Sequence, residues 1–158
     1  MSAVTRPPNR LLQALPSAEY AQLHPLLETV ELTKETALAD AGAPVQRVYF
    51  PHAGVVSMMV NLSDGQSVEI ATIGRDGIVG ASAALHERPP LADAIVVVPG
   101  TASVMRAEDF REAANRSAEF RTLVALYEQA LMAQTQQSVA CNVSHPVEAR
   151  LSRWLLRA

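Results

Sequence analysis

The sequence predicts a mainly β fold with flanking helices, in which a double-stranded β-helix of the jelly-roll type is followed by one long helix. Strand-like runs follow one another from Glu28 to about Met105, each of about four to eight residues and bounded by Gly, Pro or Asp-Gly. Helical patterns lie before and after this region. Regularly spaced short strands with such breaks are typical of small antiparallel barrels rather than of parallel sheets.

Composition indicates one globular unit and excludes several classes of protein. The 158 residues are 49% hydrophobic and 18% charged, and the net charge of −3 provides no general basic field for binding nucleic acid. Cys141 is the single cysteine, so one chain builds neither a disulfide framework nor an iron–sulfur cluster. The N-terminus lacks the apolar core of a signal peptide, and no run reaches about 18 apolar residues. We therefore expect a cytoplasmic protein that makes no membrane contact.

Two short helices are predicted at the N-terminus. Asn9 is placed to cap a leucine-containing helix that Pro16 ends. Ser17 is placed to cap a second helix, and Pro25 is expected to kink or split it.

The predicted strands alternate with turn residues. Gly42, Pro51, Gly54, Pro99 and Gly100 are among the expected breaks. The expected strands are 29–33, 45–50, 55–62, 67–73 and 94–98.

A short helical turn at 108–114 and then a long helix are predicted after the strands. Ser117 is placed to cap the long helix, which runs to about Cys141 and is roughly 37 Å long at 1.5 Å per residue. This helix is apolar on more than one side, so it either packs wholly on its own barrel or also forms a two-fold dimer seam, the interpretation we favour. The expected dimer contacts are Phe120, Leu123, Val124, Tyr127, Leu131 and Gln134.

The segment from Gly74 to Leu85 is the candidate ligand site. Its three glycines, spaced by three, crowd backbone N–H groups into a turn before small helix-forming residues, an arrangement suited to a small anion. The tentative ligand contacts are Gly80, Ala81 and Ser82, with Arg88 reaching in from the following loop. The alternative is that the glycines serve only tight turns.

A chain break near 142–145 predicts a separate last helix, with Pro146 in its first turn. Arg150, Arg153 and Arg157 share one face, which is more simply a solvated face than a phosphate contact. Trp154 and neighbouring apolar residues on another face indicate one half of a hydrophobic core.

These segments resemble the Crp/Fnr superfamily of bacterial transcription regulators, with its cyclic-nucleotide-binding-like β-roll. The likeness extends over nearly the whole chain from about Leu11 and rests on 48–57, 65–69, 74–85, 137–142, His145 and 150–156. The resemblance implies an effector-sensing β-roll with N-terminal helices at 1–115, a dimerisation helix at 116–142, and at 143–158 the first helix of a DNA-binding domain that is otherwise absent. It implies a homodimer that meets operator DNA and RNA polymerase only through the intact protein.

The resemblance also bears on the effector. Cyclic-AMP-binding relatives place a glutamate after the second glycine of the cassette and an arginine before a Ser/Thr-Ala pair. Here those positions are Ala81 and, at about the arginine position, Pro90. A buried phosphate requires a guanidinium as well as backbone amides, so we expect a small anionic or nucleotide-like effector and not standard cyclic AMP binding.

No catalytic residues and no metal site are predicted. The four histidines are scattered without helical pairing, although some relatives bind haem, for which His86 and Cys141 are the candidates. The alternative function is a small cupin-like β-barrel enzyme or metal-binding protein, which requires clustered His and Glu ligands that Glu69 and the dispersed histidines do not supply. The effector, the target promoters, the sign of regulation and any redox activity of Cys141 are left open.

Overall fold

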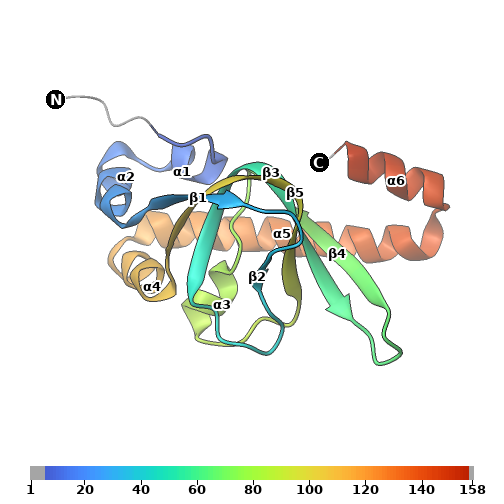
Figure 1. Cartoon of the computed structure of the whole chain (residues 1–158). Coiled ribbons are helices and arrows are strands. Elements are labelled where there is room, and N and C mark those ends of the chain that lie inside the picture. The colour runs from blue at the N-terminus through green and yellow to red at the C-terminus, as the bar shows by residue number, and fades with distance from the viewer. Residues whose placement is uncertain (1–5, 157–158) are drawn as a thin grey trace.

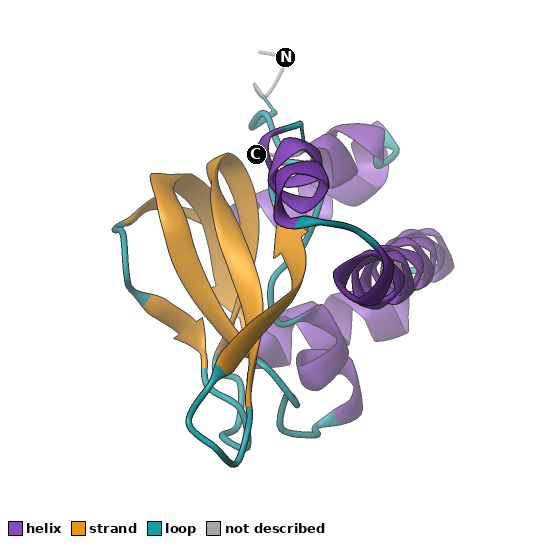
Figure 2. Ribbon diagram, turned by 90° about the vertical axis from the view of Figure 1, so that its right-hand side faces the viewer, coloured by secondary structure: helices purple, strands orange, loops and turns teal. Residues whose placement is uncertain are grey.

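Two long strands, β3 (Arg47–Asn61) and β5 (Asp93–Arg106), form the centre of the molecule. The structure, a computed structural model, describes residues 6–156. Its antiparallel sheet has the strand order β1-β5-β3-β4, and a short strand, β2 (Ala37–Ala39), also pairs with β5. The sheet curls, and the helices lie along one side of it (Figure 2). The predicted fold class, an antiparallel β-roll with flanking helices, is confirmed.

The length of β3 and β5 corrects the predicted strand breaks. Two strands were expected in place of β3, and β5 was expected to end before Pro99. Instead both strands continue, with register shifts between Pro51 and Val56. The two backbones cross closely here, because a Cβ on Gly100 would lie 2.1 Å from the Ala53 carbonyl oxygen. The breaking residues therefore bend the strands without ending them, which is how β-bulges act in curled sheets.

The other strands follow the prediction more closely. β1 (Glu28–Leu32) and β4 (Ser67–Ile73) match the expected runs within one residue at each end. β2 was not predicted, because three residues are too few to show strand alternation.

Asn9 caps α1 (Arg10–Ala14), as predicted. Its Oδ1 accepts hydrogen bonds from the N–H groups of Leu11, at 3.0 Å, and Leu12, at 3.1 Å. Its amide also donates to the carbonyl oxygens of Pro51 and Gly77, both at 3.0 Å. A fully buried polar side chain thus fixes α1 to β3 and to the loop after β4.

The second helix, α2 (Ser17–Leu23), begins at Ser17, and Pro16 takes the cap position that we assigned to Ser17. The predicted split at Pro25 is confirmed, because α2 gives way to a 3₁₀ turn, η1 (His24–Leu26).

Three helices follow β5. They are α4 (Ala107–Arg116), α5 (Ala118–Ser144) and α6 (Val147–Leu155). The predicted cap of α5 is confirmed, because Ser117 Oγ accepts from the Phe120 N–H at 3.0 Å. α5 runs along the roll, and α6 turns back beside its C-terminal half (Figure 1). None of the helices in residues 6–156 combines the length and apolarity needed to cross a bilayer.

The hydrophobic core has two parts. One lies between the sheet and the helices, where the Phe110 ring lies 6.2 Å from that of Phe50 and 5.3 Å from that of Phe120, measured between centroids. The other fills the curl of the sheet with apolar side chains: Leu32, Val56, Ile73, Val79, Ala94, Val96 and Ala102.

The burial of α5 corrects part of the expected dimer interface. Phe120, Val124 and Tyr127 are 1%, 0% and 9% exposed and pack in the chain's own core. They have almost no surface left for a second copy, so their assignment to a dimer seam is wrong. Leu123 and Leu131 are half-buried and pack against the same core. Gln134 is half-buried too, and its Oε1 accepts from the Thr72 N–H at 2.9 Å.

Candidate functional site

The glycine cassette joins β4 to α3 (Ala81–His86). Gly80 caps this helix with a φ of +85°, and its carbonyl accepts from the Ala84 N–H at 3.0 Å. The helix predicted to begin in the cassette is therefore present. Two backbone hydrogen bonds between Tyr49 and Val79, of 3.1 and 2.8 Å, fix the cassette to β3.

Tyr127 connects α5 to the cassette. Its hydroxyl donates to the Ile78 carbonyl oxygen at 2.8 Å. Gly77 makes room for this contact, because a Cβ there would lie 3.0 Å from the Tyr127 hydroxyl and 2.6 Å from Ile73 Cγ2. Burial raises the pKa of Tyr127 well above its ordinary value, so the hydroxyl keeps its proton and stays a donor. The sequence pattern placed Tyr127 in a dimer seam and gave no signal of this contact.

Arg111 fixes the other side of the cassette helix. Its Nε donates to the Ala84 carbonyl at 3.1 Å, and its guanidinium pairs with Glu87 at 2.7 Å. The cassette helix is thus held by α4 through Arg111, while the preceding loop is held by α5 through Tyr127.

The structure does not bring the four predicted ligand contacts together. Ala81 is 3% exposed and packs in the core, whereas Ser82 at the start of α3 is exposed. Arg88 lies beyond the end of α3 and lines a hollow of about 390 Å³ with residues of α3, α4 and the segment before β3. Gly80, Ala81 and Ser82 do not line that hollow. A ligand in this hollow would meet Arg88 and Arg106 and not the start of α3.

The two positions that correspond to charged cyclic AMP contacts supply no charge. The Ala81 side chain is a buried methyl group. Pro90 is half-buried, and its carbonyl accepts from the Gly42 N–H at 2.9 Å. Neither a ribose hydroxyl nor a phosphate finds its usual charged partner at these places.

The remaining candidate groups have structural contacts. His52 Nε2 lies 2.8 Å from Ser103 Oγ, and burial lowers the pKa of His52, which favours its neutral form. Cys141 is buried, and its Sγ lies 3.2 Å from Gln137 Nε2. Across residues 6–156, His, Cys, Asp and Glu side chains nowhere gather in the threes that a metal ion needs.

Comparison with known sequences identifies a family. The model of the cyclic nucleotide-binding domain matches residues 29–117, which are more than half of the chain. The sequence matches no curated protein.

Solved structures with a similar fold include bacterial regulators. The c-di-GMP-responsive global regulator CLP of Xanthomonas campestris is 12% identical with a TM-score of 0.71, over 89% of this chain and 70% of that one. The N-terminal domain of a transcriptional regulator from Streptomyces coelicolor A3(2) is 21% identical with a TM-score of 0.59, over 82% and 90% of the two chains. The Catabolite Activator Protein of Thermus thermophilus is 20% identical with a TM-score of 0.61, over 84% of this chain and 61% of that one. At such identities the likeness shows a common fold.

Proposed function

Since the chain belongs to the cyclic nucleotide-binding domain family, we propose that it is the effector-sensing and dimerisation part of a Crp/Fnr-type transcription regulator. The observation that carries the proposal is the direct attachment of the cassette to α5 through the Tyr127–Ile78 hydrogen bond. A ligand that displaces the cassette changes the position of α5, because Gly77 leaves no space between the two. Differential binding to two positions of α5 is what an allosteric sensor requires.

The proposed effector is a small anionic or nucleotide-like molecule other than cyclic AMP. Ala81 and Pro90 support this choice, because neither has a charged group for a ribose or a cyclic phosphate.

Isothermal titration calorimetry of the 158-residue chain tests this proposal. The ligands are cyclic AMP, cyclic di-GMP, nucleoside triphosphates and small organic acids. We expect cyclic AMP to bind no more tightly than about 1 mM and one of the other ligands to bind at micromolar concentrations. Tight binding of cyclic AMP would show that the substitutions at Ala81 and Pro90 do not disqualify it.

We also propose that α5 forms the dimer through the face opposite the core. Heptad spacing selects seven positions on that face, all exposed in the single chain and none charged. Met132, Val139 and Val143 are 60%, 53% and 86% exposed, so three large apolar side chains share this face. The other four members of this exposed seam are Thr122, Ala125, Gln129 and Gln136. Pairing two copies along the seam buries the apolar positions and brings the Gln residues of both copies together.

We propose that the intact regulator acts in the cytoplasm and contacts operator DNA and RNA polymerase. In this proposal α6 is the first helix of the DNA-binding part and follows the dimer helix directly. Any change in α5 reaches α6 across the turn at His145 and Pro146.

A further inference from the structure

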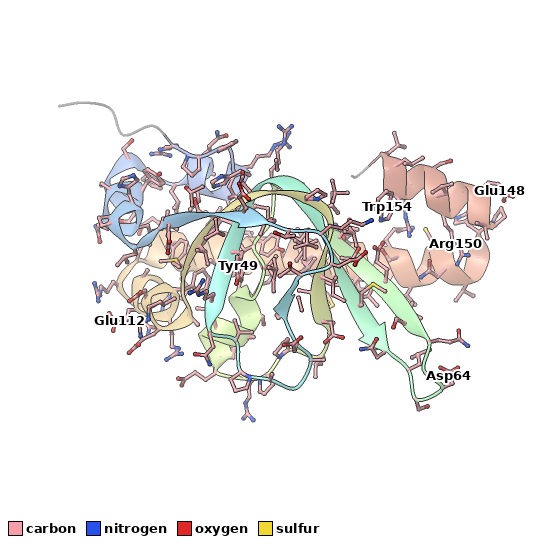
Figure 3. All side chains as sticks on the ribbon, viewed as in Figure 1. Tyr49, Asp64, Glu112, Glu148, Arg150 and Trp154 are labelled. Carbon is pink, nitrogen blue, oxygen red and sulfur yellow. The ribbon has the colours of Figure 1, made fainter. Side chains whose placement is uncertain are left out.

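α6 lies beside the roll over a hollow. The hollow has a volume of about 470 Å³ and lies between β4, α5 and α6. Among the described residues, α6 has no buried side chain, and two side-chain hydrogen bonds hold it to the rest. Trp154 Nε1 donates to Glu69 Oε2 of β4, and an Arg153 guanidinium N–H donates to the Gln137 carbonyl of α5, both at 3.3 Å. Figure 3 shows Arg150 and Trp154 on α6, with Arg150 in the space beside the end of α5.

Part of the lining is apolar. Val147, Leu151 and the Trp154 indole contribute from α6, and Val68 and Ala71 contribute from β4. These side chains suit the flat body of an aromatic ligand, which stacks on an indole or packs against its edge.

Unpaired polar groups gather on the α5 side. Gln134 is oriented by the Thr72 N–H, which binds its Oε1, so its Nε2 is left to donate to another acceptor. The side chains of Ser138 and Asn142 line the same hollow and form no hydrogen bond with other described residues. Arg150 lines it as well and makes no ion pair within residues 6–156.

One acid, Glu69, also lines the hollow and forms no ion pair with Arg150. Its Oε2 accepts hydrogen bonds from Ser57 Oγ and from Trp154 Nε1, and neither of these belongs to the donors of α5. The hollow therefore combines a guanidinium without an ion pair in residues 6–156, neutral donors, one carboxylate and an apolar part that includes an indole. Pockets of about 300–1,000 Å³ with an apolar lining and a few convergent polar groups are typical small-molecule sites.

We propose that this hollow is a second ligand site, separate from the cassette, which takes a planar aromatic carboxylate. The carboxylate pairs with Arg150 and accepts from the donors of α5, and the ring lies against Trp154. A ligand here fills the space under α6 and holds that helix against β4. The site stands on its own residues and does not depend on the cassette effector.

Titration of the whole 158-residue chain with benzoate tests the proposal, with calorimetry and tryptophan emission measured in parallel. Trp154 is the single tryptophan, so a change in emission reports on this hollow. We expect benzoate to bind with a dissociation constant of about 1 mM or tighter and to change the emission. Benzamide, which has the same shape without the charge, is expected to bind at least about tenfold more weakly.

Two substitutions identify the site. Arg150→Ala is expected to weaken benzoate binding about tenfold or more, with Arg150→Lys in between, because lysine keeps the charge and loses the planar fork. Arg121→Ala removes an exposed arginine of α5 that does not line the hollow and is the matched control, expected to bind like the parent. Circular dichroism verifies that each variant is folded. Absence of benzoate binding, equal binding of benzamide, an unchanged emission, or full binding by the Arg150→Ala variant would each overturn the proposal.

Discussion

At the scale of single residues, the contact between Gly77 and Tyr127 is the closest-fitting part of the cassette. Gly77 has no side chain, and the Tyr127 ring and the Ile73 methyl occupy the space that a Cβ would need. The glycine therefore serves packing here, which agrees with the structural alternative given above for the cassette glycines. Gly74, in the same loop, has no such neighbour, since its nearest contact would be 3.7 Å away at Asp76 Oδ1.

The first prediction compares these two glycines. Gly77→Ala is expected to lower the free energy of unfolding by about 1–3 kcal/mol, because the new methyl group overlaps a packed core. Gly74→Ala is the matched control and is expected to change it by less, since its methyl group has ordinary contacts. Urea unfolding followed by circular dichroism measures both. Equal stabilities for the two variants would show that the α5 contact is looser than described.

The second prediction concerns alkaline pH. Burial raises the pKa of folded Tyr127 above the value of about 10 that it has in the unfolded chain. The folded state therefore holds this proton longer, so its contribution is complete below about pH 10 and is lost as the pH rises further. Tyr127→Phe is expected to cost about 1 kcal/mol at neutral pH through the lost hydrogen bond to Ile78. It is also expected to make the loss of stability above pH 10 less steep, by up to about 1.4 kcal/mol per pH unit.

Denaturant unfolding of both proteins at several pH values measures this difference. If the free energy of unfolding falls as steeply above pH 10 in the Tyr127→Phe variant as in the parent, the Tyr127 hydroxyl is not buried as described. Tyr20, whose pKa burial also raises, leaves some alkaline dependence in both proteins.

At the scale of elements, α5 has two faces that differ in burial. The face marked by Phe120, Val124 and Tyr127 belongs to the core of one chain. The exposed seam lies on the other side and has the heptad spacing of a two-stranded coiled coil. The sequence indicated that the helix has more apolar surface than the roll covers. It also predicted the dimer seam at Phe120, Val124 and Tyr127, and these side chains pack in the core instead.

The third prediction tests this assignment. Met132→Glu is expected to produce a monomer, because two like charges would meet in the middle of the seam. Ala130→Glu introduces the same charge at an exposed position on another side of α5 and is expected to remain dimeric. Light scattering at micromolar concentrations measures the mass of each. A monomeric parent, or a dimeric Met132→Glu variant, would rule out this seam.

At the scale of the whole molecule, the cassette lies where three parts meet. β3 binds it through Tyr49, α4 through Arg111 and α5 through Tyr127. α6 lies at the other end of α5 and is held by far fewer contacts. The cassette is thus firmly attached and α6 is loosely held, which is the distribution of stability that the proposed movement of α6 needs.

The sequence by itself determined the order and type of most elements, β2 and the unbroken β3 excepted, because local signals decide them. Asn9 and Ser117 fit the helix caps, Pro25 splits a helix, and alternation with turn residues predicts a β-roll. Only the tertiary structure decided which face of α5 is buried, that β3 and β5 pass through their glycines, and that Arg88 lies apart from the start of α3. The physical reason is that these facts depend on contacts between segments far apart in the chain. No local pattern of apolar residues distinguishes a face that meets the chain's own core from one that meets a second copy.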